Sequence, residues 1–180
     1  MLEQLALYAR PVLNFPVVHR TRRNHGLEHA TIHLLSNKRY RLSGRSSGSG
    51  FLLFGDVPTE TVETAVEEAL RRMRGGEHHL AVHPNCGTNL VTAGLLTSLV
   101  GMIGLSGTDR RESWNRLPLT MIMMMVTVLL SQPLGMNLQR YFTTDGDPGN
   151  LEVVSITRSE VRTPFSSTPV TVHHVATRSS

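Results

Sequence analysis

The chain has 180 residues, enough for one domain or for a small domain with an appendage, and too few for a second full domain. Its formal charge of +4 comes almost wholly from arginine, and the basic residues crowd the first quarter. No aromatic residues interleave with them for base stacking, so they favour an anionic membrane surface over nucleic acid. Cys86 is the only cysteine, which excludes an intramolecular disulfide and indicates a reducing compartment or a ligand role.

Residues 1–23 form a basic, partly amphipathic segment. Apolar residues recur there at helical spacing, at Leu2, Leu5, Ala6, Ala9 and Val12. This spacing predicts a short helix that lies on a membrane or on the domain. A loosely held terminus is the alternative. The layout of a secretory signal is missing.

The next segment carries the motif His25-Gly-Leu-Glu28-His29, in a helix expected to run from an Asn24 cap to Asn37. On a helix, His25 and His29 lie one turn apart on the same face, with Glu28 beside them. Two imidazoles at this spacing can bind one Zn²⁺, and the carboxylate can accept a proton from water activated by the ion. This reversed zincin order needs a further ligand from elsewhere.

Two strands and a second helix follow in the predicted soluble part. Residues 39–44 and 51–56 flank a Ser/Gly-rich run and predict an antiparallel hairpin with a loop rather than a tight turn. Thr59 is expected to cap a helix whose apolar stripe ends at Gly75-Gly76, and residues 77–83 alternate as a third strand. The sequence therefore predicts an α+β fold with a small α-β-β-α-β layer domain.

A second motif, His83-Pro-Asn-Cys86-Gly, places a histidine and a cysteine three residues apart on a turn. Short His/Cys spacings on turns commonly present two ligands to one ion. With His25 and His29 they would complete a tetrahedral nitrogen and sulfur set, which favours Zn²⁺. We interpret these four residues as metal ligands and Glu28 as the catalytic base. The competing hypothesis makes Cys86 a thiolate nucleophile.

Residues 90–136 predict a transmembrane helical hairpin. Neither 90–105 nor 117–136 carries a charge, and a spanning helix needs about 20 apolar residues. Residues 106–116 would join the two helices. The alternative, two core helices of a soluble protein, needs a larger protein around them. The basic first quarter favours a cytoplasmic soluble part.

Residues 137–158 are expected to lead back to the soluble part, with a strand at 151–156 that rejoins the sheet. Asp145 and Asp147 are explained by turn chemistry. Residues 159–180, rich in Ser, Thr, Val and Pro, are expected to be a disordered tail. The predicted segments are therefore 1–23, 24–89, 90–136, 137–158 and 159–180.

Three segments resemble, in the same order, motifs of the YqhQ-like bacterial membrane proteins, which are described as predicted metal-dependent enzymes. These segments are His25-Gly-Leu-Glu28-His29, His83-Pro-Asn-Cys86-Gly-Thr-Asn89, and Leu138-Gln-Arg-Tyr-Phe-Thr-Thr144 followed by Leu151-Glu-Val153. The resemblance implies that the motif histidines, Glu28 and Cys86 form the site beside a membrane-embedded hairpin. It supplies no substrate. Members of that family are longer, have more membrane segments, and usually carry a different residue at the position of Leu27.

The sequence thus favours an integral membrane protein whose α/β portion binds zinc and acts as a metal-dependent hydrolase. Its expected partner is the lipid membrane, with no nucleic acid. One alternative is a membrane-anchored scaffold or interaction module in which the metal site is structural, because a site closed by four protein ligands leaves no open position. Another is a membrane-anchored domain whose histidines pack or face solvent.

Overall fold

The computed structural model describes residues 1–162 and 169–179 and divides into two compact units. The larger unit consists of Met1–His83 and Arg140–Ser180, and the smaller one of Pro84–Gln139. Residues 163–168, part of the segment expected to be disordered, lie outside the described residues.

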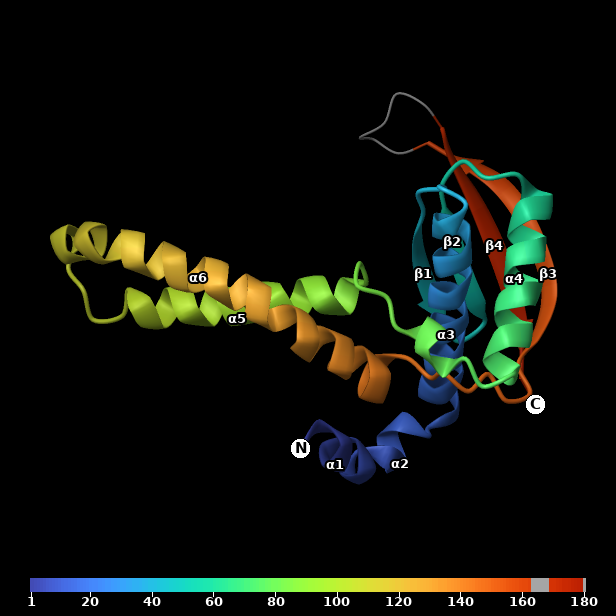
Figure 1. Ribbon diagram of the computed structural model, residues 1–180, viewed down its shortest axis with the longest axis horizontal. Coiled ribbons are helices and arrows are strands. Elements are labelled where there is room, and N and C mark those ends of the chain that lie inside the picture. Colours follow the sequence, from blue (N-terminus) through green and yellow to red (C-terminus); the bar gives the residue numbers. More distant parts are fainter. Residues whose placement is uncertain (163–168, 180) are drawn as a thin grey trace. The chain divides into compact units, whose positions relative to one another are not determined.

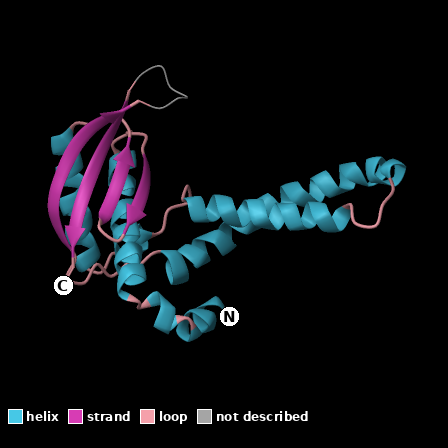
Figure 2. Cartoon of the chain, turned by 180° about the vertical axis from the view of Figure 1, so that it is seen from behind, coloured by secondary structure: helices cyan, strands magenta, loops and turns pink. Residues whose placement is uncertain are grey.

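The larger unit is built on a four-stranded antiparallel sheet with the order β1-β2-β4-β3. Helices α3 (Pro16–Asn37) and α4 (Thr59–Arg74) cover one face of this sheet (Figures 1 and 2). The strands are β1 (Ser43–Ser47), β2 (Gly50–Phe54), β3 (Glu152–Val161) and β4 (Val170–Arg178). The predicted α+β class is confirmed, and the core lies between the helices and the sheet.

Helix α4 follows the prediction closely. Its N-cap is the extended Pro58 and not the predicted Thr59, which is the first helical residue, and the helix ends before Gly75 and Gly76 as expected. Gly76 has φ +96°, a conformation that favours glycine. The apolar stripe is buried against the core, and its members are Val62, Ala65, Val66, Ala69, Leu70 and Met73.

Helix α3 is longer than expected and begins at Pro16, so Asn24 is not an N-cap. Proline suits the first position of a helix, where its missing N–H would have no intrahelical partner. Asn24 is instead buried within the helix, where its Nδ2 donates to the Ser47 carbonyl at 2.8 Å and its Oδ1 accepts from Thr177 Oγ1 at 2.6 Å. This side chain therefore ties α3 to β1 and β4.

The β1–β2 hairpin is antiparallel as predicted, but its turn is tight. Ser47 pairs with Gly50, which leaves Gly48 and Ser49 as a two-residue turn. Gly50 has φ +140°, and a Cβ there would overlap the carbonyl oxygen of Val175 on β4. Only glycine fits this turn next to the neighbouring strand, and the Ser/Gly-rich composition does not reveal that neighbour.

Two predictions about β structure are wrong. Residues 77–83 form no strand, because the 3₁₀-helix η1 (His78–Ala81) buries the consecutive residues Leu80 and Ala81, whereas a strand would send them to opposite faces. The segment expected to be a disordered tail contributes the end of β3 and all of β4. Strand β4 lies between β2 and β3, where its β-branched residues are paired on both sides. The predicted return strand is confirmed and extends to Val161.

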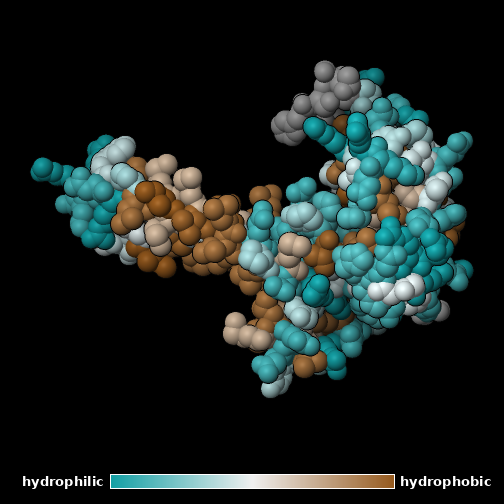
Figure 3. Space-filling view, viewed as in Figure 1, coloured by the Kyte–Doolittle hydropathy of each residue, from teal (hydrophilic) through white to brown (hydrophobic). Residues whose placement is uncertain are grey.

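The smaller unit is a helical hairpin of α5 (Gly87–Gly104) and α6 (Arg110–Leu138). Both helices are long and apolar enough to cross a membrane, and only 11% of each apolar window is buried. Figure 3 shows the apolar side chains that gather along this hairpin. The connection is shorter than the predicted 106–116, because Asp109 caps α6 through a 2.8 Å bond from the Glu112 N–H.

Two buried amides close the base of this hairpin. The Asn89 Nδ2 donates to the Pro84 carbonyl at 2.6 Å, and its Oδ1 accepts from the Gln139 Nε2 at 2.8 Å. Gly135 allows the close approach, because a Cβ there would lie 3.0 Å from Asn89 Cα. The turn that contains Cys86 is therefore held between Pro84 and Asn89.

His173 on β4 is a buried histidine in the core of the larger unit. Its side chain is 0% exposed, and its Nε2 lies 3.2 Å from the Thr59 hydroxyl. Its Nδ1 has no hydrogen-bond partner among the described residues. Burial lowers the pKa of His173 because it disfavours the charged imidazolium, and the charge of Arg158, its pairing partner on β3, lowers it further.

Acid is therefore expected to destabilise the larger unit. Below about pH 6.5 an unfolded chain protonates His173 while the folded chain does not, so the free energy of unfolding falls as the pH drops from there towards the lower folded pKa. The slope is at most about 1.4 kcal/mol per pH unit. Unfolding of detergent-purified protein, followed across this range, measures it. His173→Gln should flatten the pH dependence, whereas His174→Gln, at an exposed neighbour, should leave it unchanged. Equal slopes in all three proteins would contradict the assignment.

Candidate metal centre

The predicted pair of imidazoles is assembled on α3. The rings of His25 and His29 meet edge to face, with centroids 4.3 Å apart. A ring nitrogen of one lies within 4.8 Å of a ring nitrogen of the other. His29 is 3% exposed and His25 is partly exposed, so the pair lies at the edge of the core. Two nitrogens at this separation can bind the same ion.

Backbone carbonyls from two other segments orient both rings. The Nδ1 of His29 lies 2.8 Å from the carbonyl oxygen of Ala81 in η1, and the Nδ1 of His25 lies 2.9 Å from that of Thr143. A carbonyl can only accept, so each Nδ1 carries the hydrogen, and each neutral ring has its lone pair on Nε2. Metal-binding histidines are typically oriented in this way. Ala81 and Thr143 act through their main chain, so no side-chain pattern in the sequence could have identified them.

His83 joins the pair from the residues after η1. Its ring centroid lies 5.9 Å from that of His29. Burial lowers the pKa of His83, and the nearby His29 and His33 lower it further. The neutral ring is the form that binds a metal. The structure therefore gathers three predicted ligands from two segments that are more than 50 residues apart in the sequence.

Glu28 points to the sheet and lies against β1. Its carboxylate accepts a short hydrogen bond from the Ser46 hydroxyl, and the side chain is 4% exposed. A Cβ at Gly44 would lie 2.6 Å from Glu28 Cδ, so glycine makes room for the carboxylate. Burial raises the pKa of Glu28, partly offset by the Ser46 hydrogen bond and the charge of His25. A carboxyl group in this state can exchange protons closer to neutral pH than an exposed one.

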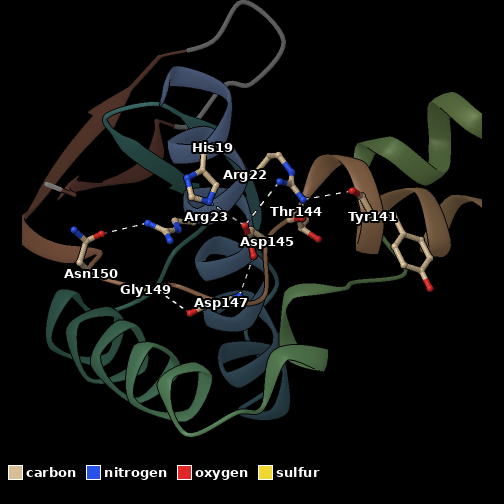
Figure 4. Close-up of polar contacts among 9 residues, drawn as sticks. All are labelled: His19, Arg22, Arg23, Tyr141, Thr144, Asp145, Asp147, Gly149 and Asn150. Atoms are coloured by element: carbon tan, nitrogen blue, oxygen red, sulfur yellow. Dashed lines mark hydrogen bonds and ion pairs between the residues drawn. The ribbon is translucent and has the colours of Figure 1, made fainter. Parts of the chain in front are cut away.

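An ion-pair cluster fixes the segment that provides the Thr143 carbonyl (Figure 4). The Asp145 carboxylate lies 3.3 Å from His19 Nε2 and 3.8 Å from Arg22 Nη1, and the Asp145 N–H donates to the Arg22 carbonyl at 3.0 Å. Arg22 also donates to the Thr144 carbonyl at 3.0 Å. Asp145 accepts from the Asp147 N–H as turn chemistry predicts, but its ion pairs with α3 were missed.

The other predicted site residue, Cys86, belongs to the helical unit. It is buried, and its sulfur accepts from the Thr88 N–H at 3.4 Å where α5 begins. Cys86 follows His83 by three residues, so the chain alone keeps their Cα atoms within about 11 Å of each other.

The comparison with known families gives a match over residues 20–156 to the family described as Domain of unknown function (DUF6391). The chain belongs to this family. A similar protein of Picosynechococcus sp., named only as uncharacterized, is 40% identical over 52% of this chain and 57% of its own length. The chain thus matches little more than half of that relative. No solved structure matches this chain, and the YqhQ-like resemblance is not confirmed.

The family match includes every residue of the candidate centre. It begins at Arg20, five residues before His25, and it ends at Ile156 within β3. Both hairpin helices, Arg22 and Asp145 lie inside it, whereas His19, α1 (Leu2–Tyr8), α2 (Arg10–Leu13) and β4 lie outside. The match therefore covers both motifs and both apolar helices of this chain in a single span, and the similar protein is bacterial.

Proposed function

We propose that the protein is an integral membrane zinc protein in which His25, His29, His83 and Cys86 bind one Zn²⁺. The observation that carries this proposal is the pair of adjacent α3 imidazoles, each oriented by a backbone carbonyl at its Nδ1 so that Nε2 is the metal-binding nitrogen. Nitrogen and sulfur donors favour Zn²⁺ over Mg²⁺ or Ca²⁺. Cys86 completes the set on the strength of its short connection to His83.

The function that this donor set supports best is metal-dependent hydrolysis. A bound Zn²⁺ supplies Lewis-acid chemistry and lowers the pKa of water. In this proposal Glu28 accepts the proton from the attacking water, and its burial raises its pKa, which makes it a stronger base than an exposed carboxylate. Catalysis needs an open position, so a hydrolytic site would use His25, His29 and only one of His83 and Cys86 as ligands.

A structural zinc site is the second candidate function, and the position of Glu28 favours it. The Glu28 carboxylate already accepts a hydrogen bond from the Ser46 hydroxyl, and the Glu28 side chain faces β1. Four protein ligands would close the site, and closed sites are structural. The metal would then link α3 to the start of the apolar hairpin and serve a membrane-anchored scaffold.

The α5–α6 hairpin is proposed to span the membrane, with the larger unit on the cytoplasmic side. The large apolar side chains of both helices are exposed in the structure, which suits contact with lipid. The arginines of the first quarter favour the cytoplasmic side for the larger unit.

Metal content tests the shared site. We expect detergent-purified protein to contain about one equivalent of zinc, as one tetrahedral site requires. His25→Ala and Cys86→Ala should each lose most of it, because both motifs contribute ligands. His33→Ala, at an exposed histidine of the same helix, is the matched control and should retain it. Retention of zinc by folded Cys86→Ala would remove Cys86 from the ligand set, and freshly purified wild type without metal would overturn the proposal.

Glu28→Gln separates the two candidate functions. The amide keeps the shape of the side chain and can still bond Ser46, but it cannot accept a proton from water. If the site is hydrolytic, Glu28→Gln should retain zinc and lose the zinc-dependent hydrolysis of an activated ester such as p-nitrophenyl acetate. The measurement compares initial rates with and without chelator. Equal zinc-dependent rates in the two proteins, or none in either, would favour the structural site.

A further inference from the structure

The N-terminal helices expose apolar side chains in unusual number. Helices α1 and α2 lie beyond the first turn of α3, away from the sheet (Figures 1 and 2). No residue of either helix, both of which the structure describes in full, is buried. The large apolar side chains that are 48% to 85% exposed here are Leu5, Leu7, Tyr8, Val12, Phe15 and Val17. An apolar surface of this extent is typical of an interaction site.

A terminus free in water does not explain these helices. Isolated helices shorter than about 12 residues are marginal in water, because nucleation costs more than the few hydrogen bonds return. Helix α1 has 7 residues and α2 has 4. Pro11 and Pro16 interrupt the segment, so the pieces cannot gain stability by joining into one long helix. Their helical order therefore requires an apolar surface to pack against.

The charges indicate which surface this is. Arg10 and Arg20 are exposed, and Glu3 is the only carboxylate residue before Glu28. Tyr8 and Phe15, 85% and 59% exposed, provide aromatic rings of the kind that is enriched at membrane interfaces. Apolar and aromatic side chains combined with arginine suit the headgroup region of a bilayer that contains anionic lipid.

We propose that residues 2–17 lie in the headgroup region of an anionic bilayer as an interfacial segment. This rests on the membrane part of the proposed function and not on the zinc site, because a spanning α5–α6 hairpin would hold the segment near the lipid at high effective concentration. Helix α3 then starts at the bilayer surface. His25 follows Val17 by eight residues, which is about 12 Å of helix. The candidate metal centre would therefore face substrates at the membrane surface.

Tryptophan quenching by brominated lipid tests the proposal on the full chain. The background variant is Trp114→Phe, which removes the only tryptophan. Phe15→Trp and Tyr8→Trp are then placed separately in vesicles of phosphatidylcholine and phosphatidylglycerol, with bromine either near the headgroup or near the chain end. Both should lose emission, and more strongly with the shallow bromine. Val154→Trp, at a β3 residue that is also 59% exposed, should keep its emission.

Two further variants make each outcome decisive. Leu129→Trp on α6 reports insertion of the hairpin and should be quenched by the deep bromine. Arg10→Glu combined with Arg20→Glu should reduce quenching at position 15 in the anionic vesicles and not in pure phosphatidylcholine. The proposal is overturned if tryptophan at position 129 is quenched but tryptophan at positions 8 and 15 is not. That result would mean that protein or solvent, and not lipid, surrounds positions 8 and 15. Loss of quenching at position 129 as well would overturn the membrane part of the proposed function.

Discussion

Gly26→Ala is expected to destabilise the larger unit and to loosen the candidate metal centre. A Cβ at position 26 would overlap the Asp145 carbonyl oxygen and lie 3.2 Å from Ala81 Cβ. The obstacle at Asp145 is backbone, which the His19 and Arg22 ion pairs hold in place, so it cannot move aside cheaply. Overpacking of this kind typically costs about 1–3 kcal/mol and occasionally more.

The same substitution should also disturb the orientation of the two proposed metal ligands on α3. Asp145 and Ala81 belong to the two segments whose carbonyls orient His25 and His29. If α3 moves away from them to admit a methyl group, the hydrogen bonds at 2.9 Å and 2.8 Å lengthen and both rings lose their orientation. We therefore expect weaker zinc binding together with lower stability. Denaturant unfolding and zinc content of the same preparation measure the two effects.

Gly94→Ala is the matched control for this experiment. Gly94 also lies inside a helix, α5, but no described atom lies within 4 Å of a Cβ there. Alanine should be neutral at that position or stabilise by about 0.5–1 kcal/mol, as it generally does within a helix. If Gly26→Ala has the same free energy of unfolding and the same zinc content as the wild type, the close approach of α3 to residues 81 and 145 contributes nothing to stability or to metal binding.

The elements that the sequence predicted are those with a local signal. Helix α4 has a continuous apolar stripe and a glycine stop, and the ligand pair on α3 follows from helical spacing alone. The structure also brings His83 to the pair, as the joint interpretation of the two motifs requires. Local periodicity was sufficient for α4 and for the histidine pair, because it fixes which side chains share a helix face whatever segment packs against that face.

The failures concern elements defined by distant partners. Strand β4 reads as an unpatterned Ser/Thr/Val tail, and it becomes a strand because β2 and β3 pair with it on both sides. The tight turn before Gly50 depends on the close approach of the Val175 carbonyl. Helix α3 begins two turns before the motif, whereas the predicted Asn24 cap would have started it directly before His25. Likewise, the Ala81 and Thr143 carbonyls orient the ligands without any side-chain signature.

The proposed zinc ion is expected to stabilise the larger unit, so its removal should lower the free energy of unfolding substantially. A ligand that binds only the folded state stabilises it by RT ln(1 + [L]/Kd), about 4 kcal/mol when the free ion is at a thousand times its Kd. The proposed ligands of the larger unit come from α3 and from the residues after η1, so an ion there would tie two segments that the chain must otherwise bring together. A chelator such as EDTA should therefore shift thermal unfolding to lower temperature in detergent-purified protein.

His29→Ala identifies the source of that shift. His29 has ring contacts with both His25 and His83, so its loss should abolish the difference between zinc-loaded and chelated protein. The variant also loses the hydrogen bond to Ala81, and for this reason the informative quantity is the zinc-dependent increment within each protein and not the absolute stability. His33→Ala should keep the full increment. A zinc-dependent increment that survives in His29→Ala would place the ion elsewhere, and α3 would then hold its histidines for packing alone.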